Sequence, residues 1–591
     1  MGRVAGRVQL FFTYDKTKDQ SKCNICGIKL AGHHSTNLKR HLSKKHQETY
    51  ESLSEDIGEP KKACKRRKIV IETTEDEVIS AVVNIASDGG NPLSLFDNEG
   101  FRMLFNPIFD ALEMPQITSQ NIMDHVSGKE LDIKQGIRAS VERKLVSLKL
   151  DVATGLERSV LVINLQFISS TLTGNDIVVK TLGVIQLSED LTELCLKNKI
   201  VETMESYGIQ MDQIFSITTD NGKNMATAIE LLNENAAAES VNDEDNGEYF
   251  MELLNSMTFP NVPLLRCAAH TLHLCVHDVN RQSEFSQKFS SCRQMCKVLR
   301  IGKYRRTLMQ EDKPIPTLDV PGRWNSSYTM LVQLFELKEF ITSQIEVDFS
   351  IDWAWVEVYI EAFKETHEAT LLLEKEHFSY SDFFILWMEL KLKAEKTQNY
   401  LMKELLCQLK VREKQLWENK AFLAAIYMDP RVNLILTAEQ KATAKILLKQ
   451  IAFRIFSSNG TIKPPEIKIE STEADVKEKS LLESFLDDIQ TLPQAEFEAD
   501  VSEKLAKIYM EIENFSTAYG RLPLNSDIKK FYHDLKFRSP QIGALVQVVL
   551  AAPASQVTVV RSFSALKVII NYPKTLTPEN MNSLLIVRLN S

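Results

Sequence analysis

The sequence has no run of about 18 uncharged apolar residues, the length that a helix needs to cross a membrane, so we expect no membrane span. The first residues also lack the apolar segment of a secretory signal. Of the nine cysteines only Cys23 and Cys26 form a close pair, which is too few for a disulfide framework in 591 residues. These absences favour a reducing compartment, in which a cysteine pair binds metal.

Acidic residues are outnumbered by basic residues in the first part of the chain, and they outnumber basic residues in the remainder. Residues 1–70 hold 16 Lys and Arg against 7 Asp and Glu, a charge of +9, whereas the whole chain carries −9, so the remainder carries −18. A basic head on an acidic body indicates that the head meets a polyanion, because phosphate contacts supply most nonspecific nucleic-acid affinity. The length predicts two to four folded units, each with a core of its own.

Residues 23–46 carry four metal-binding side chains at zinc-finger spacing. Two residues separate Cys23 from Cys26, fourteen separate Cys26 from His41, and four separate His41 from His46. Two thiolates from a tight turn and two imidazoles from a short helix complete a tetrahedral shell for Zn²⁺, which folds a module too small to fold alone. We therefore predict a zinc site with these four ligands.

The residues around His41 predict a short basic helix. Ser35 is a candidate N-cap for a helix that turns His41 inward. A helix with many exposed cations enters a major groove and contacts phosphates. The side chains predicted to contact DNA are Asn37, Lys39, Arg40, Lys44 and Lys45.

Aromatic residues before the cysteine pair and an "LKRHL" segment before the last histidine give this head a resemblance to the BED-type zinc finger. In that family the module binds DNA. Two alternatives stay open. His33 and His34 are rival ligands, although they leave little room after Cys26 for a strand and a helix, so we place them in a loop. The second alternative is that the module is a zinc scaffold that binds protein instead of DNA.

After the finger, the segment at 60–68, "PKKACKRRK", is strongly basic. Such a run is typical of a nuclear import signal or of a further phosphate contact, and its plain alternative is a solvated linker. Beside a DNA-binding finger we favour the nuclear interpretation, and we predict a location in the nucleus.

The body of the chain begins with helix-period apolar residues and then changes period. In residues 78–140 the predicted packing face of a helix consists of Phe101, Leu104, Phe105, Ile108 and Leu112. Runs rich in β-branched residues follow at 145–155, 159–169 and 176–187, and they predict an antiparallel meander. A helix, a fourth strand ending at "ITTD" and another helix make this region α/β with mixed strand directions.

Two aspartates stand out by position in these strands. Asp151 lies in the first strand and Asp220 ends the fourth. Adjacent strand ends bring two carboxylates together, and such a pair holds Mg²⁺ for phosphoryl transfer. The alternative is that Asp220 with Asn221 and Gly222 forms only a turn and a helix cap.

Five motifs occur in the order seen in hAT-superfamily transposases, which the chain resembles over nearly its whole length. They are "SLKLDVATG" at 147–155, "ITTDNGKNM" at 217–225, "RCAAHTLHL" at 266–274, "DVPGRWNSSYTML" at 319–331 and "RSFSALK" at 561–567. The resemblance implies a ribonuclease H-like core that a long all-helical insertion interrupts, with a carboxy-terminal segment that completes the core and forms dimers.

We therefore expect a multidomain α/β protein. Its expected parts are a BED zinc finger at 1–50, a basic linker at 51–77, a helical connector at 78–140, the first part of a ribonuclease H-like core at 141–294, a helical insertion at 295–520, and a carboxy-terminal core and dimerisation part at 521–591. The polar, acidic stretch at 458–500 is predicted to be an exposed linker, and the acidic stretch at 232–249 is predicted to be a disordered loop.

The resemblance also implies which residues would form the catalytic site. In hAT transposases two Asp and one Glu place two Mg²⁺ ions around the scissile phosphate. Asp151 and Asp220 match the two aspartates, but Val560 stands at the position of the glutamate. Because valine neither binds a cation nor accepts a proton, we predict that the core has no nuclease activity.

A second zinc site at Cys267, His270, His273 and His277 is a weaker alternative, because four ligands on one helix face crowd each other. Trp324 is predicted to be a core residue and, alternatively, a wedge against DNA bases.

The predicted function is that of a nuclear, sequence-specific DNA-binding protein derived from a hAT transposase, which acts in transcription or chromatin and is not an enzyme. Its predicted cofactor is Zn²⁺, and its predicted partners are double-stranded DNA, a second copy of the chain and chromatin or transcription proteins. The alternatives are an active, Mg²⁺-dependent transposase and a zinc-finger scaffold that binds other proteins.

Overall fold

The computed structural model describes most of the chain and divides it into two compact units, which we call the amino-terminal unit (1–74) and the carboxy-terminal unit (75–591). The described residues are 7–55, 70–88, 91–155, 158–170, 175–187, 192–220, 222–239, 261–320, 323–374, 378–458, 495–570 and 576–591. The predicted basic cluster at 60–68 lies outside these ranges.

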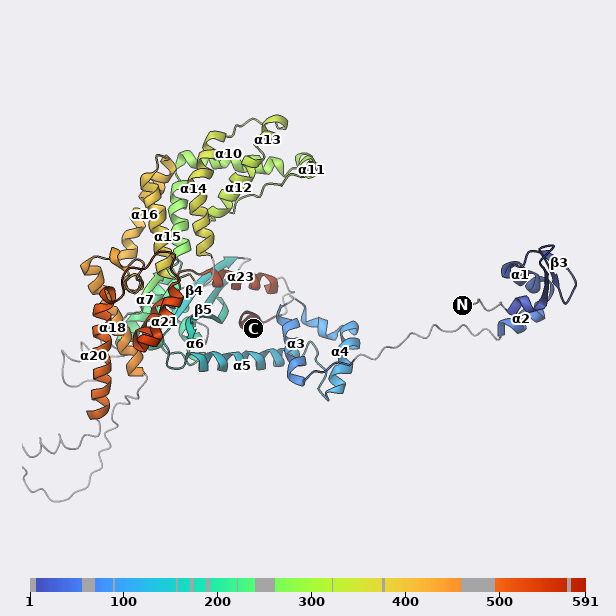
Figure 1. Ribbon diagram of the computed structural model, residues 1–591, viewed down its shortest axis with the longest axis horizontal. Coiled ribbons are helices and arrows are strands. Elements are labelled where there is room, and N and C mark those ends of the chain that lie inside the picture. The colour runs from blue at the N-terminus through green and yellow to red at the C-terminus, as the bar shows by residue number, and fades with distance from the viewer. Residues whose placement is uncertain are drawn as a thin grey trace, which may run out of the picture. The chain divides into compact units, whose positions relative to one another are not determined.

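The amino-terminal unit is a three-stranded antiparallel sheet followed by two helices (Figure 1). Its elements are η1 (Arg7–Phe11), β1 (Phe12–Asp15), β2 (Gln20–Cys23), β3 (Lys29–Ala31), α1 (Ser35–Lys45) and α2 (Gln47–Glu55). Helix α1 turns Leu38 and Leu42, four residues apart and therefore on one face, onto Val8 and Phe12. This core is small.

The carboxy-terminal unit is built on a mixed five-stranded sheet in the order β6-β5-β4-β7-β8. Its strands are β4 (Val146–Gly155), β5 (Arg158–Ser170), β6 (Asn175–Leu187), β7 (Ile214–Thr219) and β8 (Leu264–Arg266). The antiparallel pairing of β4 with β5 and of β5 with β6 confirms the predicted meander. Strand β7 runs parallel to β4, and β8 runs parallel to β7. Strand β8 was not predicted, because three residues are too few to show a period.

Helices cover both faces of this sheet, since side chains of a strand alternate between its faces. In β5, Leu161 and Ile163 face a core shared with α5 (Ile122–Val141), α6 (Glu193–Ser206) and α7 (Lys223–Glu239). Val160 and Val162 face the other core. That second core is completed by α3 (Glu75–Asp88), η2 (Leu93–Asp97), α4 (Glu99–Ala111), α23 (Val557–Ile570) and α24 (Pro578–Asn590).

From α9 onward, all regular structure among the described residues is helical. Helices α14, α15 and α16 pack against one another in a stack that leads away from the sheet (Figure 1). The remaining elements of the unit are η3 (Met211–Gln213), α9 (Ala268–Asn280), α10 (Ser283–Leu299), α11 (Gly302–Gln310), α12 (Trp324–Glu336), α13 (Lys338–Gln344), α14 (Trp353–Leu373), α15 (Tyr380–Lys396), α16 (Tyr400–Trp417), α17 (Lys420–Tyr427), η4 (Asn433–Ile435), α18 (Ala438–Ser458), α20 (Ala495–Ala518), α21 (Ile528–Arg538) and α22 (Pro540–Leu550).

Three details differ from the sequence-based expectations. Leu104 was assigned to a packing face, but its side chain is 68% exposed, because α4 turns Phe101 and Phe109 inward instead. Helix α7 continues to Glu239, so the first residues of the predicted disordered loop at 232–249 are helical, while 240–249 lie outside the described residues. Helix α20 begins at Ala495, so the end of the predicted linker at 458–500 is helical, while 459–494 lie outside the described residues.

Candidate functional site

A tight turn after β2 places the two cysteines of the amino-terminal unit. The backbone N–H of Gly27 donates to Cys23 O at 2.9 Å, and the N–H of Cys23 donates to Ile28 O at 2.9 Å. Gly27 has φ of 74°, a left-handed conformation that glycine adopts without the Cβ penalty. The turn thereby presents Cys23 from the buried side and Cys26 from the exposed side.

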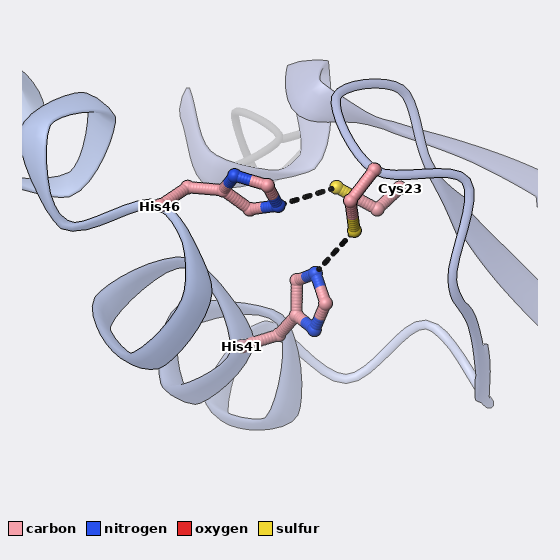
Figure 2. A group of neighbouring side chains, drawn as sticks. Cys23, His41 and His46 are labelled. Atoms are coloured by element: carbon pink, nitrogen blue, oxygen red, sulfur yellow. Dashed lines mark hydrogen bonds between the residues drawn. The ribbon is translucent and has the colours of Figure 1, made fainter.

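Helix α1 and the residue that follows it supply the two imidazoles (Figure 2). His41 Nε2 lies 3.3 Å from Cys26 Sγ, and His46 Nε2 lies 3.6 Å from Cys23 Sγ. His41 also meets the ring of Phe12 edge-on, with 5.7 Å between centroids. The aromatic residue ahead of the cysteine pair therefore supports a ligand.

The four ligand atoms suit one zinc ion. All lie within 4.8 Å of one another. Zinc bonds of about 2.0 to 2.3 Å in a tetrahedron put neighbouring ligand atoms about 3.3 to 3.8 Å apart. Burial lowers the pKa of His41, and the charges of His46 and Lys45 lower it further, which favours the neutral imidazole that binds metal. Among the described residues, no other set of three or more such ligands comes together.

The rival ligands His33 and His34 lie outside this centre. His33 Nδ1 is 2.8 Å from Ser21 Oγ, and its ring stacks on Tyr14 with 4.6 Å between centroids. His34 is the N-cap residue of α1 and makes no side-chain capping bond. The prediction that Ser35 is the N-cap was therefore wrong by one residue, because Ser35 already has helical geometry.

Helix α1 turns its cations to solvent. All five predicted DNA contacts, Asn37, Lys39, Arg40, Lys44 and Lys45, are exposed. Asn37, Arg40 and Lys44 follow each other at spacings of three and four residues, so they form one stripe on the helix. Leu38 and Leu42 fill the opposite side in the core. The buried side thus fixes the helix while the polar stripe remains available.

In the carboxy-terminal unit, the parallel pairing of β4 and β7 brings the two aspartates together. Lys149 is registered with Thr218. Asp151 and Asp220 each follow two residues later, so Asp151, in the middle of β4, and Asp220, directly after the end of β7, lie next to each other and on the same side of the sheet. This register explains how residues 69 positions apart become neighbours.

The proximity of the two carboxylates has an electrostatic consequence. Burial raises the pKa of Asp151 to about 6, and the charge of Asp220 raises it as well. Asp220 Oδ1 accepts hydrogen bonds from Gly222 N at 2.9 Å and from Thr219 Oγ1 at 3.3 Å. The local hydrogen bonding expected from the alternative interpretation of Asp220 is therefore present together with the acidic pair.

Helix α23 lies against β4 and β5, beside this pair. Lys149 Nζ donates to Thr558 Oγ1 at 3.2 Å, and Gln556 Nε2 donates to Leu150 O. Val560 falls in the first turn of the helix. Sequence reasoning missed these contacts, because nothing in the sequence pairs residues about 400 positions apart.

Two further predictions concern the region around α9 and α12. The rings of His270, His273 and His277 stack in a row along α9, with centroids 5.6 and 5.8 Å apart, and do not gather with Cys267 into a ligand set. Trp324 is 3% exposed, as expected for a core residue.

Comparison with known proteins identifies the amino-terminal unit. The family model of the BED zinc finger matches residues 9–47. No curated protein matches the chain. A BED zinc finger with its four zinc ligands in place indicates sequence-specific DNA binding. No helix in the described ranges has the length and apolar character of a membrane span.

Proposed function

We propose that this protein is a nuclear, sequence-specific DNA-binding protein derived from a hAT transposase, and that it regulates transcription or chromatin without nuclease activity. The observation that carries the proposal is the zinc centre of the BED finger beside a helix with an exposed polar and basic stripe. A helix of this kind docks in the major groove, where Arg reads guanine and Asn reads adenine.

The three residues of the stripe, Asn37, Arg40 and Lys44, are suited to different contacts with DNA. Arg40 and Asn37 carry side chains that form paired hydrogen bonds with base edges, and Lys44 suits a phosphate. Lys39 and Lys45 lie on the flanks and supply charge. A dimer formed through the carboxy-terminal region would present two fingers and increase affinity by avidity.

The absence of nuclease activity rests on the resemblance to hAT transposases. Asp151 and Asp220 stand where that family has its two aspartates, and α23 lies beside them. Val560 stands at the position of that family's third carboxylate, so Asp151 and Asp220 would hold a divalent cation with one ligand fewer.

The DNA-binding proposal is tested by selecting binding sites from a randomised duplex library with the purified full-length protein at physiological salt. We expect enrichment of one motif. The Asn37→Ala/Arg40→Ala protein, whose zinc ligands are intact, should lose the motif while retaining salt-sensitive nonspecific binding. A library that stays random with the unsubstituted protein contradicts the proposal and favours a protein-binding scaffold.

The inactive core is tested by incubating supercoiled plasmid with Mg²⁺ or Mn²⁺. We expect no nicking. Nicking that disappears in the Asp220→Ala protein would instead establish an active transposase.

A further inference from the structure

A cavity of about 540 Å³ opens at the end of the sheet opposite to Asp151 and Asp220. The loops that enter the parallel strands β4 and β7 form its walls, together with the ends of α5 and α18. Its charged lining residues are Arg138, Glu142, Arg143, Lys144, Asp212 and Arg454. Four cations against two carboxylates leave a local excess of positive charge.

The most buried of these cations forms no ion pair with a carboxylate of the described residues. Arg454 is 8% exposed, and its Nη2 donates to two neutral acceptors, Asp212 O and Ile214 O, the latter at 3.0 Å. Its Nε has no hydrogen-bond partner within the described part of the chain. Burial lowers the pKa of Arg454 to about 10, an effect that Asp212 offsets only in part. A buried cation with this environment is costly to keep.

Elsewhere the same unit neutralises a buried arginine with carboxylates. Arg431 is 7% exposed, and its Nη2 lies 2.6 Å from Asp429 Oδ2 and 2.7 Å from Asp382 Oδ1. The guanidinium of Arg431 is therefore charge-compensated within the protein. The contrast indicates that the compensating anion of Arg454 comes from outside the described residues.

A second arginine, Arg138, lies close to a glycine at the wall of the cavity. Gly208 has φ of +68°, and a Cβ built there would lie 2.9 Å from Arg138 Nε. Any side chain at this position would displace the guanidinium. Lys144 is anchored nearby, with Nζ 5.3 Å from the centroid of the Phe167 ring. Both side chains are exposed, Arg138 on α5 and Lys144 in the loop that enters β4.

We propose that this cavity binds the phosphate group of a small phosphorylated molecule. Guanidinium groups bind phosphate through paired, charge-assisted hydrogen bonds, and the volume is that of a small-molecule site. Glu142 and Asp212 would accept hydrogen bonds from hydroxyl or amino groups on the rest of the ligand. This site is separate from the zinc finger and goes beyond the proposed function.

The charge of the unit favours a small anion over a DNA backbone. The chain carries −9 and residues 1–74 carry +8, so the carboxy-terminal unit carries −17. Such a body repels an extended polyanion, whereas a locally basic cavity still attracts a compact anion at short range.

The test is isothermal titration calorimetry of the full-length, zinc-loaded protein with inorganic pyrophosphate as the probe. We expect saturable binding that weakens at least tenfold in the Arg138→Gln/Lys144→Gln protein. The matched control is Arg305→Gln, an exposed arginine of α11, which should bind as the unsubstituted protein does. Arg454→Lys retains the buried charge but loses the planar fork, and it should also weaken binding.

Two outcomes would overturn the proposal. One is that the Arg138→Gln/Lys144→Gln protein binds pyrophosphate unchanged. The other is that pyrophosphate produces no saturable heat. If a 20-base-pair duplex then binds and loses affinity in that same double variant, the cavity is assigned to a DNA backbone. Circular dichroism of each variant verifies that it remains folded.

Discussion

The amino-terminal unit packs Val8, Phe12, Leu38 and Leu42 around Cys23, and its four ligand atoms converge on one point. The carboxy-terminal unit instead buries large apolar clusters on both faces of its sheet and along the helical stack. A small core cannot offset the entropy of ordering its chain, so the first unit depends on zinc. The second unit has enough core to tolerate an acidic pair and a buried arginine that forms no ion pair among the described residues.

Removing a zinc ligand should have the largest effect and should distinguish most clearly how the two units are stabilised. Cys26→Ser should unfold the finger, because structural zinc supplies about 10 to 16 kcal/mol in such modules. Hydrogen–deuterium exchange read by mass spectrometry should show full exchange across residues 9–47 and unchanged protection in the carboxy-terminal unit. Cys407→Ser, which also changes an exposed cysteine, is the control and should leave both units protected. Retained protection in the Cys26→Ser finger would mean that the apolar core suffices.

A large-to-small change in the core of the second unit should instead destabilise that unit. Phe109 is 0% exposed in α4, and Phe109→Ala should cost about 3 to 5 kcal/mol of unfolding free energy. On the same helix Leu104→Ala should change that free energy by less than about 0.5 kcal/mol, because the side chain is in solvent. Thermal unfolding measures both. Equal losses would restore the original assignment of Leu104 to the packing face.

Removing the partly buried charge of Asp151 at the acidic pair should stabilise the second unit. The pKa of Asp151 rises from 3.8 unfolded to about 6 folded, so its carboxylate is disfavoured in the folded state at pH 7 by about 3 kcal/mol. Asp151→Asn lacks this cost and should unfold at a higher temperature at pH 7.

The advantage should shrink as pH falls through 6 and vanish below about pH 4, where the wild-type side chain is protonated in both states. Thermal unfolding at pH 7, 5.5 and 4 measures it. A constant advantage at all three pH values would show that repacking, and not charge, is responsible.

The smallest expected effect is a difference in DNA binding between two double variants of α1. Arg40→Ala/Lys44→Ala and Lys39→Ala/Lys45→Ala remove equal charge, but only the first pair lies on the stripe with Asn37. We expect the first to weaken binding to the selected motif by at least tenfold, or about 1.4 kcal/mol, more than the second. Fluorescence anisotropy at several salt concentrations measures both. Equal losses would mean that α1 contributes only nonspecific charge.

The sequence determined the zinc centre, because all its ligands lie within one short segment whose spacing alone matches a tetrahedral shell. It also determined the meander of β4, β5 and β6, since their β-branched runs are long and their turns are short. Local patterns of this kind need no knowledge of distant residues. The exposure of Leu104 was mispredicted because an apolar period marks a face but does not say how wide the buried part is.

Only the tertiary structure decided which distant residues meet. The register of β4 with β7 makes Asp151 and Asp220 neighbours, and the docking of α23 places Thr558 against Lys149. The packing of α18 against the entry to β7 buries Arg454, which no sequence pattern distinguishes from a surface arginine. Burial and charge compensation are properties of the assembled chain, because they depend on what other elements remove from water.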